Sequence, residues 1–103
     1  MKKILCLGRK GDVRSAALAW LLKQKGYDAI AVGMRCMGKD TRKMMLDWAD
    51  LIILLHAKCE EGVAKGYLHK LKSWGVGRWQ PYFQGFNEHL INKLNIHIKR
   101  EKL

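Results

Sequence analysis

Apolar residues along this chain follow two alternating patterns, which are short unbroken runs and longer stretches with helical spacing. The short runs predict four strands, over residues 3–7, 28–34, 50–55 and 73–77. The stretches with helical spacing predict four helices, over residues 15–25, 40–48, 57–71 and 87–102. Strands and helices should therefore alternate along the chain, with a turn-rich segment, "RWQPYFQGF", before the last helix.

Three of the predicted helices carry boundary signals. Gly26 follows the first helical stretch, and glycine readily adopts the left-handed conformation that ends a helix. Asp40 can accept hydrogen bonds from the free amides at the start of the second helix. Gly62 and Gly66 interrupt the third stretch, so we expect a weaker helix there.

Alternating strands and helices, joined by connections long enough to cross over, predict a parallel sheet with helices on both faces. We therefore expect an α/β fold of three layers around a four-stranded parallel sheet, of the Rossmann-like kind. No linker or internal repeat divides the chain, which predicts a single domain over residues 1–103. Ligands of such sheets bind beyond the carboxyl ends of the strands, so the loop after the first strand is the expected site.

Composition indicates a soluble chain that can build its own core. Apolar residues make up 49% of the 103 residues, which is too many for a disordered chain. Cys6, Cys36 and Cys59 are widely spaced and form neither a disulfide framework nor a zinc-binding pattern. No secretory leader or membrane-spanning apolar run is visible. We therefore expect a cytoplasmic protein without a metal, a cofactor or a membrane partner, and the sequence predicts no particular oligomeric state.

The chain is strongly basic. Its 20 lysines and arginines outnumber its 9 acidic residues, which gives a net charge of +11. The excess is spread along the chain and forms no basic tail, since residues 1–50 already carry 11 basic and 5 acidic residues. Such a charge attracts anionic partners, from phosphorylated small molecules to nucleic acid, without choosing among them. A soluble basic protein with no anionic ligand is the plainer interpretation.

The segment from Cys6 to Ser15, "CLGRKGDVRS", has the composition of a phosphate-binding loop. Glycines let backbone amides turn inward, the start of a helix adds partial positive charge, and an arginine can bind two phosphate oxygens. In such surroundings the pKa of Cys6 would be lowered and its thiolate could act as a nucleophile, with Ser15 hydrogen-bonded to the sulfur. The expected anion-binding residues are Gly8, Arg9, Lys10, Gly11 and Arg14.

Each of these residues also has a purely structural interpretation. A cysteine inside a buried strand is usually a small apolar residue. Gly8 and Gly11 could serve a tight turn, and Arg14 could lie at the surface. The order of the residues, and their position directly after the first strand, favour the functional interpretation.

The motif "CLG" followed by "RS" and a helix resembles the loop of the low-molecular-weight protein tyrosine phosphatases. Two further segments, "WADLIILLH" and "QPYFQGFNEHLINKL", are similar to the family's central strand and to its Asp-Pro-Tyr segment. The resemblance covers nearly the whole chain and implies a protein tyrosine phosphatase-like hydrolase. It implies that Cys6, Arg14 and Ser15 are catalytic and that Trp79, Gln80 and Tyr82 lie at the rim of the site.

Two departures from the family pattern predict weak catalysis. Seven residues separate Cys6 from Arg14, which is two more than in the family, so the ring of amides must be enlarged or distorted. Gln80 stands where the family has its general acid, and general acid catalysis contributes about 10²–10⁴-fold. The expected function is thus binding of a phosphate-like anion on a phosphorylated small molecule or phosphoprotein, with slow phosphate monoester hydrolysis through a Cys6 phosphoenzyme.

Other families with a similar loop fit less well. Phosphotransferase-system IIB domains also have a cysteine at the end of the first strand, but the Arg-Ser pair and "QPYF" favour the phosphatases. Arsenate reductases need two neighbouring cysteines, which Cys36 and Cys59 are not, and a Walker-type loop is excluded because no Gly-Lys-Ser/Thr follows. The remaining alternative is a non-catalytic pseudophosphatase that binds nucleotide, phosphopeptide or nucleic acid, with Trp79 and Tyr82 as stacking faces.

Overall fold

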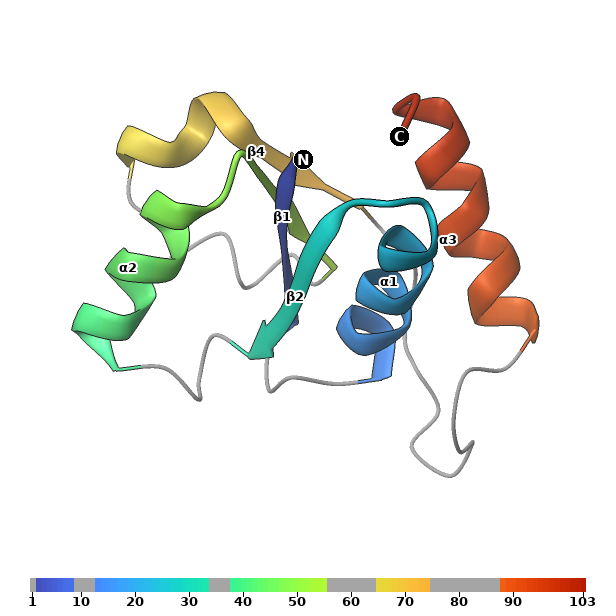
Figure 1. Cartoon of the computed structure of the whole chain (residues 1–103), viewed down its shortest axis with the longest axis horizontal. Coiled ribbons are helices and arrows are strands. Elements are labelled where there is room, and N and C mark those ends of the chain that lie inside the picture. The colour runs from blue at the N-terminus through green and yellow to red at the C-terminus, as the bar shows by residue number, and fades with distance from the viewer. Residues whose placement is uncertain (1, 9–12, 34–37, 56–64, 75–87) are drawn as a thin grey trace.

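The computed structural model describes residues 2–8, 13–33, 38–55, 65–74 and 88–103. Figure 1 shows how its strands and helices are arranged. The strands are β1 (Lys3–Gly8), β2 (Asp28–Gly33), β3 (Leu51–Leu54) and β4 (Leu71–Ser73). The helices are α1 (Val13–Gln24), α2 (Lys39–Trp48) and α3 (Glu88–Arg100), with a 3₁₀ helix, η3 (Lys65–Lys70), before β4.

The four described strands form one parallel sheet in the order β2-β1-β3-β4. In the centre of β1, Cys6 lies beside Ala31 of β2 and Ile53 of β3. This arrangement confirms the predicted α/β, Rossmann-like fold with a four-stranded parallel sheet. That residues 1–103 form a single domain stays a prediction.

Helices cover both faces of the sheet, which makes the predicted three layers (Figure 1). Side chains of β1 alternate between two apolar clusters. Ile4 and Cys6 pack in the cluster that includes α1 and α3, and Leu5 and Leu7 pack in the cluster that includes α2. Each strand side chain in the middle of the sheet is thus buried, which is why β1 and β3 read as unbroken apolar runs in the sequence.

Helix α3 closes the sheet on the same face as α1. Leu94 and Ile98 are fully buried against this face, and Ile91 packs beside them. Its His97 ring stacks on Trp74, which directly follows β4, with ring centroids 5.2 Å apart. This amphipathic spacing confirms the predicted last helix, whose described bounds are close to those expected.

Both α1 and α3 end in the same kind of C-cap. In α1, Tyr27 N donates to Leu22 O and Gly26 N donates to Lys23 O, with Gly26 at a φ of 95°. In α3, Leu103 N donates to Ile98 O and Lys102 N donates to Lys99 O, with Lys102 at a φ of 59°. Each pattern is a Schellman motif, in which one left-handed residue reverses the chain. The predicted helix stop at Gly26 is confirmed.

Three details of the sequence interpretation were wrong. Strand β4 covers Leu71–Ser73 rather than residues 73–77, because pairing of Leu71 with Ile52 of β3 determines the register. The N-cap of α2 is Gly38, without a side-chain cap, and Asp40 lies in the first turn of the helix. Within the predicted helix 57–71, the described residues 65–70 are a 3₁₀ helix, and residues 57–64 lie outside the described residues.

Within the described ranges, no helix is long and apolar enough to cross a membrane.

Candidate functional site

The end of β1 and the start of α1 lie at the carboxyl edge of the sheet. Strand β1 has β2 on one side and β3 on the other, so the strand order reverses at this point. Such a reversal leaves room beyond the strand ends, where ligands of open α/β sheets bind. In Figure 1 the ends of β1 and β2 and the first turn of α1 lie together at the lower edge. The fold therefore places Gly8 and the start of α1, which flank the predicted loop, at the expected edge.

The first turn of α1 has features that an anion-binding site would use. The turn contains no acidic residue, and the first amides of a helix carry partial positive charge because they have no intrahelical acceptor. Arg14 lies in this turn, so its backbone belongs to the helix start, while its side chain lies outside the described set. Gly8 ends β1 and is buried, which brings backbone rather than side chain to the edge.

Cys6 lies inside the sheet and not at its edge. Its side chain has no exposed surface and packs in the apolar cluster beneath α1. Burial raises the pKa of the Cys6 thiol from 9.0 to about 12, because a thiolate would lose its hydration in these surroundings. The expectation of a lowered pKa was therefore wrong, and at neutral pH Cys6 is a protonated, buried thiol.

Ser15 is also fully buried, in the second position after the helix start. It is a polar side chain within the described core, on the face of α1 that meets the sheet. Its predicted hydrogen bond to the Cys6 sulfur stays a prediction.

Several predicted site residues lie outside the described residues, and their roles stay predictions. From the loop these are Arg9, Lys10 and Gly11. From the predicted rim these are Trp79, Gln80 and Tyr82. The described ranges also hold no cluster of three His, Cys, Asp or Glu side chains that could bind a metal ion.

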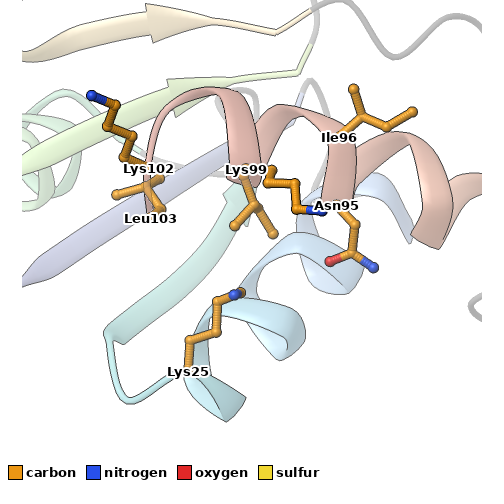
Figure 2. A pocket seen from close by; sticks show the side chains of 7 residues that line it. Lys25, Asn95, Ile96, Lys99, Lys102 and Leu103 are labelled. Carbon is orange, nitrogen blue, oxygen red and sulfur yellow. The ribbon is translucent and has the colours of Figure 1, made fainter.

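A second feature, which the sequence interpretation missed, is a crevice between the C-terminal ends of α1 and α3. Its volume is about 550 Å³. Figure 2 shows Lys25 extending from the end of α1 towards α3. The lining residues include Lys25, Asn95, Ile96, Lys99, Lys102 and Leu103. The run "HIKREKL" already shows in the sequence that the end of α3 is basic. Only the packing of α3 beside α1 brings Lys25 close to these residues.

No model of a protein family and no solved structure matches this chain. It is similar to the tRNA-specific 2-thiouridylase MnmA of Ralstonia pickettii (strain 12J), with 38% identity over 58 residues. That segment covers 50% of this chain and 15% of the relative, so the chain matches only a small part of that protein's length.

This similarity overturns the resemblance to low-molecular-weight protein tyrosine phosphatases. The relative found is a tRNA-specific 2-thiouridylase, and neither a phosphatase nor a pseudophosphatase function has support. The expected phosphate monoester hydrolysis through Cys6 was therefore wrong, and nothing supports a phosphoprotein partner. The error has a physical cause. "CLG" and "RS" are short, and the remaining segments follow the strand and helix pattern that many unrelated α/β proteins share.

Proposed function

We propose that this chain binds RNA through its phosphate backbone, with tRNA as the first RNA to test. The observation that carries the proposal is the 38% identity over 58 residues to a tRNA-specific 2-thiouridylase. Nucleic acid was already among the partners that the charge of +11 favours, since lysines and arginines that neutralise phosphates release bound counterions. The proposal covers binding and not the chemistry of the relative, because the match spans 15% of that protein.

We further propose that the carboxyl edge contacts one RNA phosphate through Gly8, Arg9, Lys10, Gly11 and Arg14. The support is the start of α1 at this edge, with no acidic residue in its first turn. Amides at a helix start bind phosphate well, and an arginine can hold two of its oxygens. Cys6 takes no part in this contact, since its side chain is buried. A protein with this partner would work in the cytoplasm, as the lack of a disulfide pattern in the sequence also favours.

The experiment is a titration of fluorescently labelled tRNA with the full chain, read by anisotropy at several salt concentrations. We expect saturable binding whose logarithmic affinity falls linearly with the logarithm of salt concentration, because phosphate contacts dominate. Duplex DNA of similar charge serves as the competitor. The proposal fails when no saturable binding occurs at low salt, or when the DNA competes as well as unlabelled tRNA does.

Arg14 separates a specific contact from a general charge effect. Replacing Arg14 by glutamine should weaken tRNA binding about tenfold, since one charge-assisted phosphate contact is lost. The matched control is Lys2→Gln, which removes the same charge from an exposed residue just before β1, at the opposite edge of the sheet. Equal losses of tRNA affinity in the two variants would mean that the carboxyl edge is not part of the RNA interface.

A further inference from the structure

The crevice between α1 and α3 is basic on both sides. Lys25 comes from the end of α1, and Lys99 and Lys102 come from the end of α3. Among the described residues that line it, none is acidic. Glu101 directly follows α3, and its Oε2 lies 3.9 Å from Lys72 Nζ, which partly neutralises its charge. The crevice thus concentrates positive charge at the edge of the molecule opposite the carboxyl ends of the strands.

Lys102 occupies a backbone conformation that lysine disfavours. Its φ of 59° is in the left-handed region, where the Cβ atom crowds the following carbonyl oxygen. The equivalent position of the α1 cap holds Gly26, the residue best suited to this conformation. Among the described residues, Lys102 is the one with a side chain in this region. A strained residue of this kind is a reason to look for a function that its side chain serves.

The electrostatics of the crevice favour a long anion lying across its rim over a small anion held inside. Helices α1 and α3 both present their C-terminal ends here, and these ends carry partial negative charge. A compact anion deep between them would meet that charge. The lysines are exposed and flexible, which suits contacts to successive phosphates outside the crevice.

We propose that this crevice is a second contact surface for the RNA phosphate backbone, separate from the carboxyl edge. The proposal rests on the proposed RNA-binding function and adds where the chain holds its partner. The simpler explanation is that the lysines only offset the helix dipoles, as basic residues at helix ends commonly do. The two explanations differ in what they predict for Lys102.

The decisive variants are Lys102→Gly and Lys102→Asn in the full chain. Glycine and asparagine both accept the left-handed conformation better than lysine, so both variants should raise the melting temperature. Both should also weaken binding of labelled tRNA, by about threefold to tenfold, because one phosphate contact is lost. If Lys102 only stabilised the helix end, both replacements would leave tRNA affinity within twofold, and that result would overturn its contact with RNA.

The triple variant Lys25→Gln/Lys99→Gln/Lys102→Gln tests the whole surface. We expect the slope of logarithmic affinity against logarithmic salt to fall by about 2 to 3. The control is Lys2→Gln/Lys23→Gln/Lys43→Gln, which removes three charges from exposed lysines that do not line the crevice. If the wild type binds tRNA and the two triple variants change the slope equally, the crevice is not an RNA contact surface, and the RNA-binding function still stands. Absence of tRNA binding by the wild type overturns both.

Inorganic phosphate, added as a competitor at constant ionic strength, should not displace tRNA. Displacement at millimolar phosphate would point to a small-anion site instead.

Discussion

At the scale of the residue, Cys6 shows how position within a sheet controls chemistry. A cysteine near a glycine-bearing loop has the sequence context of a reactive thiolate. In the structure it is enclosed between neighbouring strands and α1, and its side chain has no exposed surface. Because apolar side chains of the described residues enclose the sulfur, the same atom becomes part of the apolar core.

The raised pKa of Cys6 predicts a loss of stability at alkaline pH. The folded chain holds the thiol proton up to a pKa of about 12, whereas the unfolded chain releases it near 9.0. Above pH 9 the unfolded state therefore binds fewer protons, and the free energy of unfolding falls as the pH rises, by up to about 1.4 kcal/mol per pH unit from this group. Urea unfolding at pH 8 and pH 10 measures the change. Cys6→Ala should show a smaller decrease, and an equal decrease would assign the effect to other groups.

Gly26 offers a test of the turn between α1 and β2. Its φ of 95° disfavours every residue with a side chain, although a Cβ atom there would meet no atom within 4 Å. We expect Gly26→Ala to cost about 1–2 kcal/mol of unfolding free energy, from backbone strain alone. The matched control is Gly66→Ala, which also meets nothing within 4 Å and has no such φ. The strain explanation is wrong when both variants lose the same stability in urea titrations.

At the scale of the element, a polar network joins α2 to η3. Tyr67 donates a hydrogen bond to Asp47 with an oxygen–oxygen distance of 2.5 Å, and Lys43 donates to the other oxygen of Asp47 at 2.8 Å. Lys70 donates to Ala49 O at 2.6 Å and lies over the Tyr67 ring. These contacts link the end of α2 to the segment that leads into β4. They thereby help to hold the edge strand against β3.

The network predicts a low pKa for Asp47. Lys43 and then Tyr67 lower the pKa of this carboxyl by stabilising its charged form. The Asp47 carboxylate therefore stabilises the fold above the ordinary carboxyl pKa, and this stabilisation is lost as the pH falls through its lowered pKa. NMR titration of the side-chain carboxyl should show a pKa increase in Lys43→Met and a smaller increase in Tyr67→Phe. The reverse order would mean that the tyrosine is the stronger partner.

At the scale of the whole molecule, the charge of +11 dominates behaviour in solution. Like charges spread over a small chain repel one another and destabilise its compact state, and salt screens that repulsion. The same charge supports the proposed binding of RNA at two edges, the carboxyl ends of the strands and the crevice between α1 and α3. A partner that neutralises the charge should therefore stabilise the fold as well as bind it.

The net charge predicts that the melting temperature rises with ionic strength. Between about 20 and 200 mM sodium chloride we expect an increase of a few degrees, because screening removes part of the self-repulsion. Added tRNA at low salt should raise it further, since a ligand that binds only the folded state stabilises it by mass action. Scanning fluorimetry measures both effects. A melting temperature that falls over the same salt range would show that ion pairs outweigh the repulsion.

The alternation of apolar runs determined the fold class on its own. Residues 3–7, 28–34 and 50–55 predict β1, β2 and β3 closely, because a strand buried on both faces must be apolar throughout. Helices α2 and α3 follow in the same way from one apolar face each. Strand β4 was misplaced because it is short and partly exposed, so its position depends on pairing with β3 rather than on its own side chains.

Only the tertiary structure decided what the chemistry-bearing residues can do. The pattern put Cys6 next to a loop, but enclosure by β2, β3 and α1 decides its protonation. The basic residues were countable in the sequence, yet Lys25 and Lys102 are 77 positions apart and share a crevice only because α1 and α3 pack on the same face. Sequence patterns report local burial, whereas a pKa or a binding surface depends on neighbours that are distant along the chain.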